Sequence, residues 1–221
     1  MRPFILTFVG VLMSISLSFA GVLHKGSDTL GGHIVFVENA GQWEQSFGYR
    51  ADLPTGQMFL YNNKIVIDLR DKAMIAELMH FKMLPAEEKQ LRKQPNSVIN
   101  AHCYEMEFVG AKTDLLEKYN QTSQYYNFYL GNDDSRWKSN VYGYKSINYI
   151  NLYKGIDLGL TENEGFLKYE FYVSSSANPG DIKIKYNGID NIKLDNGNIV
   201  LSTSLGNIVE MRPLAWQIIN N

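Results

Sequence analysis

Apolar and polar residues alternate along several short segments of this chain. In residues 167–173 every second position is Leu, Tyr, Phe or Val, and residues 102–109 and 182–186 follow the same rule. A period of two places one face of a segment against a core and the other toward solvent, which predicts half-buried β-strands. Further strands are expected in the apolar runs at residues 33–38, 57–61, 64–69, 192–194, 199–201, 207–211 and 214–219.

Turn-forming residues separate these runs. Asn62-Asn63 and the stretch Asp195-Asn196-Gly197-Asn198 contain asparagine or glycine, which tolerate the positive φ of tight hairpins. Asn178-Pro179-Gly180 and Gly206 mark two more turns. Short strands with turn signals at intervals of about ten residues predict an all-β fold, built as an antiparallel sandwich or a barrel-like sheet.

One segment has a helical pattern instead. Met74, Ile75, Leu78 and Met79 recur at the spacing of one helix face, and residues 85–93 are rich in helix formers. We expect a short helical insertion near residues 71–93 that packs its apolar face on the sheet. The alternative is that its methionines form a groove for a partner. The sequence has no internal repeat of about 20–50 residues, which excludes a solenoid or a propeller built by this chain alone.

The N-terminus has the pattern of a secretory signal peptide. Arg2 gives a positive start, residues 4–19 are apolar apart from one threonine and three serines, and Ser18-Phe19-Ala20 provides small residues for cleavage. The apolar run is shorter than the roughly 20 residues of a membrane span. We therefore expect residues 1–20 to be removed, leaving residues 21–221 as one secreted or cell-surface β-rich domain without a membrane span. An uncleaved N-terminal anchor is the alternative.

Composition and net charge argue against several functional classes of protein. Hydrophobic residues make up 45% of the 221 residues, which is enough to fill a core. The 21 basic and 23 acidic residues give a net charge of −2, which argues against a nucleic-acid binder. The single cysteine, Cys103, excludes an intrachain disulfide and a Cys-rich zinc site, and the four histidines lack metal-binding spacing. We expect no cofactor and no resident metal.

Each group of residues that could act in catalysis or bind a metal also has a purely structural explanation. Cys103 follows His102, but neighbours on a strand point to opposite faces and cannot act together as nucleophile and base. Carboxylates on adjacent strands could hydrolyse a glycosidic bond, although acidic residues are common on solvent-facing strand positions. These carboxylates are Asp157, Glu162, Glu164 and Glu170. Residues 132–135 (Asn-Asp-Asp-Ser) offer oxygen ligands for calcium, but they also favour a turn closed by side-chain hydrogen bonds. We expect the chain not to be an enzyme.

Aromatic residues are concentrated between residues 119 and 153. A tyrosine combines an apolar ring with a polar tip, which suits a protein interface or stacking on a sugar, although strand propensity alone also enriches tyrosine. The candidate interface residues are Tyr125, Tyr126, Tyr129, Trp137, Tyr142, Tyr144 and Trp216.

Several ordered motifs resemble one family of exported bacterial proteins. Residues 36–43 (FVENAGQW), 126–137 (YNFYLGNDDSRW) and 152–158 (LYKGIDL) are similar to motifs of an N-terminal β-domain of unassigned function. Residues 168–173 and 213–217 extend the resemblance. That domain occurs in SBBP-repeat and gliding-motility-associated surface proteins of Bacteroidetes that use type IX secretion. The matching motif residues are Glu38, Asn39, Gly41, Gln42, Gly131, Asn132, Asp133, Gly155 and Asp157.

The resemblance implies an exported structural or interaction module that has no catalytic role. Its partners would be proteins or other modules of a longer surface protein, and the alternative is a glycan-binding or carbohydrate-active domain that uses the tyrosine-rich face. Lys154 and Trp216 stand where the family usually has proline and tyrosine. Family members continue past the position of Gln217, which predicts a domain truncated at its C-terminal end and a self-associating open edge at residues 214–219.

Overall fold

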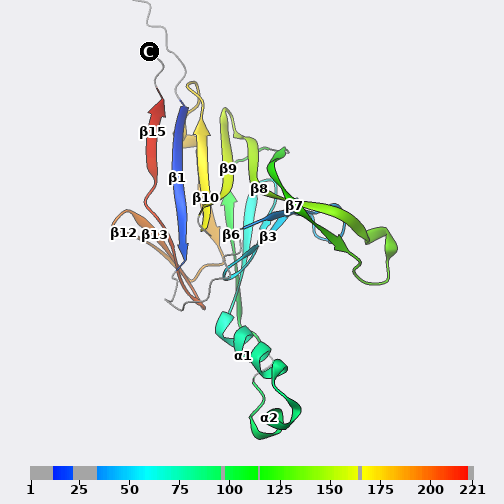
Figure 1. The fold of residues 1–221 in the computed structure, drawn as a ribbon. Helices are drawn as coiled ribbons and strands as arrows, with labels where there is room; N and C mark the ends of the chain where they lie inside the picture. The colour runs from blue at the N-terminus through cyan, green and yellow to red at the C-terminus, as the bar shows by residue number, and fades with distance from the viewer. Residues whose placement is uncertain (1–11, 22–33, 96–97, 114, 164–165, 219–221) are drawn as a thin grey trace, which may run out of the picture.

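The protein is described by a computed structural model that covers residues 12–21, 34–95, 98–113, 115–163 and 166–218 (Figure 1). Its strands form one curled, antiparallel sheet with the shape of a half-barrel, so the predicted all-β class with a short helical insertion is confirmed. The strands are β1 (Leu12–Gly21), β2 (Phe36–Glu38), β3 (Tyr49–Leu53), β4 (Gly56–Leu60), β5 (Lys64–Arg70), β6 (Ala101–Phe108), β7 (Leu116–Phe128), β8 (Lys138–Tyr153), β9 (Ile156–Asn163), β10 (Phe166–Val173), β11 (Ile184–Asn187), β12 (Asn191–Asp195), β13 (Asn198–Thr203), β14 (Gly206–Glu210) and β15 (Leu214–Ile218). The helices are α1 (Lys72–Met83) and α2 (Ala86–Leu91), with 3₁₀ turns η1 (Asp134–Arg136) and η2 (Pro179–Asp181).

Strands that are hydrogen-bonded to each other are mostly also close in sequence. The strand order is β11-β6-β5-β4-β3-β2-β8-β9-β10-β1-β14-β13-β12, while β7 pairs with β8 and β15 pairs with β1. Most neighbours in this order are also consecutive in sequence, because short turns join antiparallel strands. The predicted hairpins lie at residues 62–63, between β4 and β5, and at Asn196-Gly197, where φ is 51° and 87°.

Aromatic rings in the core show how the sheet closes on itself. The ring of Phe108 on β6 lies 5.9 Å from that of Tyr149 on β8 and 6.5 Å from that of Phe171 on β10. Six strands separate β6 from β10 along the sheet, so these contacts require it to curl around a common core. The core faces of β6 and β10 are the ones that the alternation predicts, with Tyr104, Met106, Leu167, Tyr169 and Val173 buried as well.

The helical segment leaves the sheet instead of covering it. It is inserted between β5 and β6, and α1 and α2 extend away from the end of that hairpin (Figure 1). No residue of either helix is buried, and Met79, Met83 and Leu91 are exposed, so the prediction that this segment packs on the sheet is wrong. The physical reason lies at its two ends, where Arg70 pairs with Ala101 and the backbone N–H of Asp71 donates to the carbonyl of Asn100 (3.0 Å).

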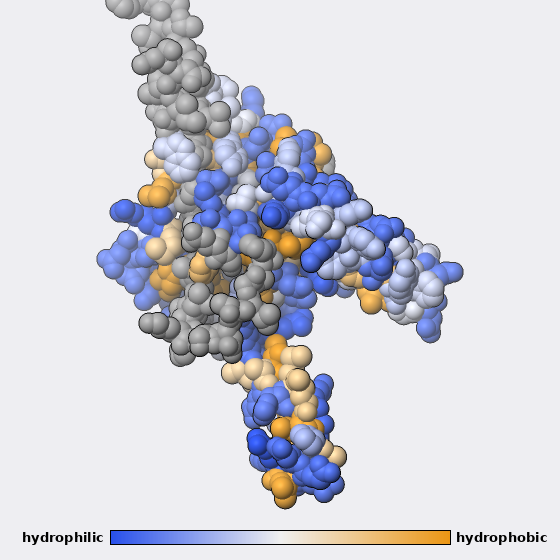
Figure 2. All heavy atoms as spheres, viewed as in Figure 1, coloured by the Kyte–Doolittle hydropathy of each residue, from blue (hydrophilic) through white to orange (hydrophobic). Residues whose placement is uncertain are grey.

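Local chemistry alone accounts for the helices. The Asp71 side chain caps α1 by accepting a hydrogen bond from the Met74 N–H, and α1 ends at Met83, with Leu84 as its C-cap before Pro85. Glu88 and Arg92, one turn apart on and after α2, form an ion pair at 3.7 Å. Within the described residues, neither helix has the length and apolar character needed to cross a membrane. Figure 2 shows apolar atoms on the surface of this helical projection.

We expect the sheet to fold without the helices. Replacing residues 72–99 by Asn-Gly should join Asp71 to Asn100 and change the free energy of unfolding by less than about 1 kcal/mol, because none of the described residues in this range is buried. Urea unfolding of this variant and the full chain, monitored by near-UV circular dichroism, measures the difference. A loss of more than about 2 kcal/mol would show that the helices support the sheet.

Candidate functional site

Four exposed aromatic residues lie on a two-stranded arm, defined here as residues 125–142, which projects to one side of the sheet (Figure 1). β7 pairs with β8 from Leu116 opposite Tyr149 to Phe128 opposite Lys138. Among the described strands, β8 meets β2 and β9 only from Gly143 onward, so residues 138–142 are paired with β7 alone. The arm is therefore a ribbon two strands wide that extends beyond the core.

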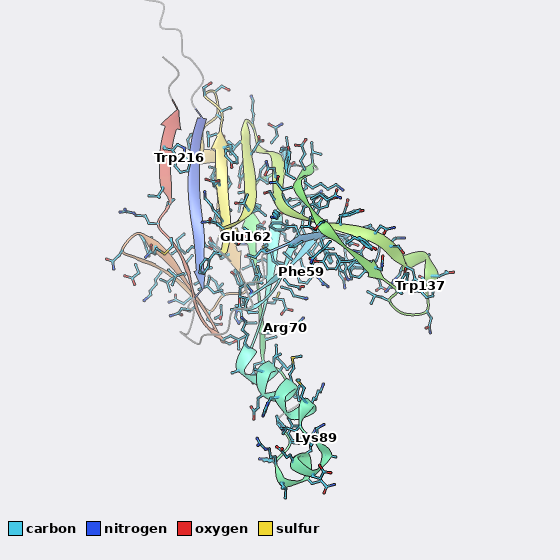
Figure 3. All side chains as sticks on the ribbon, viewed as in Figure 1. Phe59, Arg70, Lys89, Trp137, Glu162 and Trp216 are labelled. Atoms are coloured by element: carbon cyan, nitrogen blue, oxygen red, sulfur yellow. The ribbon has the colours of Figure 1, made fainter. Side chains whose placement is uncertain are left out.

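Four large aromatic side chains are open to solvent on the arm. Tyr125 is 53% exposed, Tyr129 is 60% exposed and Trp137 is 45% exposed, and Tyr126 is also exposed. The rings of Tyr129 and Trp137 meet edge to face at 5.7 Å, and the Tyr129 hydroxyl lies 2.9 Å from Ser139 Oγ. These contacts hold the rings in fixed orientations at the distal end of the arm, where Figure 3 labels Trp137.

The other three candidate interface residues occupy different environments. Tyr142 is half-buried and packs edge to face against Tyr125 at 6.1 Å. Tyr144 is buried opposite Phe36 at the root of the arm, so it belongs to the core rather than to the exposed surface. Trp216 is exposed on β15, at the opposite side of the sheet from Trp137 (Figure 3). The exposed aromatic residues of the arm are thus Tyr125, Tyr126, Tyr129 and Trp137, with Tyr125 and Tyr126 on opposite faces of the ribbon and Tyr142 packed against Tyr125.

A loop formed by residues 39–47 is held together by the side chain of Asn39. The amide nitrogen of Asn39 donates to the carbonyls of Gln45 (2.8 Å) and Phe47 (3.1 Å). Its amide oxygen accepts from the backbone N–H groups of Gly41 (3.1 Å) and Trp43 (3.3 Å). One side chain therefore satisfies backbone groups along the whole loop, which explains why asparagine stands at this motif position.

Gln42 closes the same loop from inside. Its side chain is fully buried, donates to the carbonyl of Glu38 (2.6 Å) and accepts from the N–H of Ala40 (2.7 Å). Gly41 has a φ of 101°, and a Cβ atom there would lie 3.3 Å from Lys138 Cε. Asn39, Gly41 and Gln42 thus fix the backbone geometry of the loop.

The 39–47 loop packs against the arm near its tip. The Trp43 ring packs 5.0 Å from that of Phe128 on β7, and the Arg50 guanidinium lies over the Trp43 ring, 4.5 Å from its centroid. Glu38 pairs with Lys118 at 2.6 Å, and Glu44 pairs with Arg136 in the tip turn. The two motif regions near residues 38–43 and 131–137, which the sequence presents separately, are brought together here.

The motif residues at the tip of the arm, Gly131, Asn132 and Asp133, also form a turn. Asp133 accepts hydrogen bonds from the Ser135 hydroxyl (2.6 Å) and the Ser135 N–H (3.1 Å), and these bonds lower the pKa of its carboxyl. Gly131 has a φ of 68°, a conformation that glycine adopts without strain, and Asn132 is exposed beside it. The hydrogen bonds of Asp133 are those of the turn expected as the alternative to a calcium site.

The last motif positions shape the turn between β8 and β9. Asp157 Oδ1 accepts from the N–H of Asn151 at 2.6 Å. Gly155 has a φ of 71°, and a Cβ atom there would lie 2.5 Å from Ser174 Oγ. Asp157 therefore closes the turn itself, and Gly155 allows the turn to approach the loop at Ser174, whose N–H donates to the Gly155 carbonyl (2.9 Å).

One model of a known protein family matches this chain. The family model described as Domain of unknown function (DUF7948) matches residues 36–221, from the first residue of β2 to the end of the chain. The chain belongs to the DUF7948 family. No curated protein and no solved structure matches it. The match covers the 39–47 loop, the helical insertion and the arm of this DUF7948 domain, and its description assigns no function. The resemblance to SBBP-repeat and gliding-motility proteins stays a prediction.

The carboxylates considered for catalysis are engaged in other contacts. In the DUF7948 domain, Asp157 stands opposite Tyr172, and Glu170 stands opposite Gly159, on neighbouring strands. Glu170 accepts from the Tyr172 hydroxyl (3.2 Å) and pairs with Lys168 (2.9 Å). Glu162 lies at the other end of β9, and Glu164 is outside the described residues.

The remaining candidate groups of the DUF7948 domain are Cys103, His102 and possible metal ligands. Partial burial and the nearby carboxylates of Asp68 and Glu105 raise the pKa of the exposed Cys103 thiol, which disfavours the nucleophilic thiolate. His102 Nδ1 lies 3.0 Å from Ser204 Oγ. Within the described part of the chain, no group of three or more His, Cys, Asp or Glu residues is arranged to hold a metal ion.

Sequence reasoning missed one buried carboxyl. Glu210, at the end of β14, is fully buried and accepts hydrogen bonds from the hydroxyls of Tyr169 (2.9 Å) and Tyr186 (2.7 Å) at Oε2. Burial raises the pKa of Glu210, and burial together with the neighbouring carboxyl raises the pKa of both tyrosines. Nothing local in the sequence marks this cluster, because its members come from three separate strands.

Proposed function

We propose that this DUF7948 chain is an exported, non-catalytic interaction module that binds a protein partner through the arm. The observation that carries the proposal is the set of four exposed aromatic side chains on a ribbon beyond the core, Tyr125, Tyr126, Tyr129 and Trp137. Tyrosine and tryptophan are the residue types that contribute most binding energy per side chain in protein interfaces. A group of exposed apolar side chains gathered on one element, as opposed to single scattered ones, indicates an interaction site.

The construction of the arm supports binding by preorganised rings. A two-stranded ribbon is marginally stable alone, and this one is braced by the Trp43–Phe128 contact near its tip and by the Glu38–Lys118 pair on β7 before the arm begins. The edge-to-face packing of Tyr129 on Trp137 limits the ring conformations that a partner would otherwise have to order. Support for the arm is thus built into the same motif loop that defines the family resemblance.

Two further observations support export and the absence of catalysis. The N-terminal apolar run ending in Ser18-Phe19-Ala20 matches the pattern that a signal peptidase cleaves. The candidate carboxylates Asp157 and Glu170 are bound to backbone or side-chain groups of the fold. We place the module at the bacterial surface, in a longer protein of the SBBP-repeat and type IX-secreted kind, on the strength of the sequence resemblance.

The arm is tested by photo-crosslinking in the producing bacterium. A benzophenone amino acid in place of Tyr129 should give a discrete crosslinked protein, and Trp137→Ala should weaken that complex by about 30-fold or more, as expected for an aromatic anchor. The matched control carries the photoprobe at Leu194, which is 77% exposed on β12 but lies outside the arm. A discrete product from Leu194 and none from Tyr129 would contradict the proposal.

Two assays on the purified protein distinguish the glycan alternative from binding of a protein partner. Binding to a glycan array that is lost with Trp137→Ala would assign the arm to sugar stacking instead of a protein partner. Hydrolysis of a glycoside panel that is lost with Asp157→Asn or Glu170→Gln would overturn the non-catalytic assignment. We expect neither array binding nor turnover.

A further inference from the structure

Strand β1 lies inside the sheet, between strands from the C-terminal half of the chain. It pairs with β10 over six positions, from Met13 opposite Val173 to Ser18 opposite Lys168, and with β15 on its other side. Its last residues, Phe19 to Gly21, pair with β14. Figure 1 shows β1 between β15 and β10.

This position is occupied by residues that belong to the expected signal peptide. Removal of residues 1–20 would take away all of β1 except Gly21. The family match begins at Phe36, so the DUF7948 domain as the family defines it does not include β1. In the processed chain, β10 would lose its partner on one side, and β15 would lose the only strand with which it pairs among the described residues.

The register defines which kind of segment fits this position. On β10 the buried residues Tyr169, Phe171 and Val173 alternate with the outward-facing positions 168, 170 and 172. Opposite the buried residues stand Leu17, Ile15 and Met13, and opposite the outward positions stand Ser18, Ser16 and Ser14. A strand with apolar residues at every second position and small polar residues between them therefore matches β10 along its length.

We propose that the β1 position of the processed protein is an acceptor site for an extended strand of a different polypeptide, with apolar residues at alternate positions. The inference goes beyond binding by the arm, but it rests on the export and processing included in the proposed function. An unpaired strand inside a sheet presents open backbone donors and acceptors that a foreign strand can satisfy. A second processed copy has lost the same residues 12–20, so it cannot supply the matching segment.

The first measurement is the N-terminus of the exported protein, which intact-mass analysis should place at Gly21. The processed protein is then mixed with a fluorescent peptide of residues 12–21 (LMSISLSFAG). We expect saturable binding by anisotropy, and an Ile15→Pro, Leu17→Pro peptide should bind at least about tenfold more weakly, because proline cannot donate to the ladder.

Disulfide trapping tests the register. The protein carries Lys168→Cys and Cys103→Ser, and the peptide carries either Ser18→Cys, which stands opposite residue 168, or Ser14→Cys. Directly opposite Cα atoms lie about 4.5–5.5 Å apart, within the reach of a disulfide, whereas Ser14 is about 13 Å further along the strand. The Ser18→Cys peptide should crosslink at least about tenfold faster, and circular dichroism should show an unchanged fold.

Each contrary result has a distinct meaning. An exported chain that retains residues 1–20 would overturn the acceptor site and the processing it rests on. A processed chain that does not bind the peptide, or links both peptides equally, would overturn the acceptor site alone and leave the arm proposal standing. A stable dimer that excludes the peptide in light scattering would also overturn it, giving the position to a second copy.

Discussion

Replacing Asn39 by alanine is expected to lower the free energy of unfolding by about 3 kcal/mol and to loosen the arm. The side chain makes four hydrogen bonds of 3.3 Å or shorter to the backbone of the 39–47 loop. A protein hydrogen bond contributes about 1 kcal/mol net, and the loss leaves partly buried backbone groups without partners. Since the loop carries Trp43, which packs on Phe128, the effect should extend to the arm.

Two readouts separate global stability from the arm. Urea unfolding gives the free energy, and limited chymotrypsin digestion reports opening of the arm, because its aromatic residues are the cleavage sites. Asn132→Ala is the matched control, since Asn132 is an exposed residue of the same type in the tip turn and should change stability by no more than about 0.5 kcal/mol. Equal digestion rates for the Asn39→Ala variant and the wild type would contradict support of the arm by the loop.

The sheet was predictable from local sequence to the extent that one face of each strand is buried. On β10 the alternation of Leu167, Tyr169, Phe171 and Val173 marks the core side correctly. The same pattern fails to report burial on β12, where Ile192 and Leu194 form a strand but remain exposed. β12 ends the sheet and has β13 as its neighbour, so its environment depends on strand order, which local periodicity does not encode.

The candidate site was predictable only in part for the same reason. Clustering of aromatics in the sequence correctly points to residues 125–137, but Tyr144 on the same strand is buried where β8 meets β2. The helical pattern of α1 is visible in the sequence, whereas its projection away from the sheet follows from the pairing of Arg70 with Ala101. Contacts between the 39–47 loop and the arm join residues about 90 positions apart, as in the Glu44–Arg136 pair.

Replacing Glu210 is the second change with a large expected effect. Glu210→Ala should destabilise the full 221-residue chain by about 3 kcal/mol, because the hydroxyls of the buried Tyr169 and the half-buried Tyr186 would both lose their acceptor. Glu210→Gln keeps an acceptor oxygen of similar shape without the carboxylate charge. Comparing the two variants separates the hydrogen bonds from the charge.

The charge makes stability depend on pH in a defined direction. Burial raises the pKa of Glu210, and its Oε1 atom has no hydrogen-bond partner among the described residues. The folded state therefore holds the proton more tightly than the unfolded chain does. This contribution to stability is fully present below the ordinary carboxyl pKa and is lost as the pH rises through the raised folded-state pKa.

We therefore expect the free energy of unfolding of the wild type to fall relative to that of Glu210→Gln as the pH rises from mildly acidic to neutral. Urea unfolding across this pH range, on the full chain in which β14 keeps both β1 and β13 as neighbours, measures the difference between the two profiles. Glu87→Gln, at an exposed position on α2, is the control and should leave the profile of the wild type unchanged. Parallel profiles for Glu210→Gln and the wild type would show that Glu210 stays ionised in the folded protein, with its two tyrosines compensating for burial.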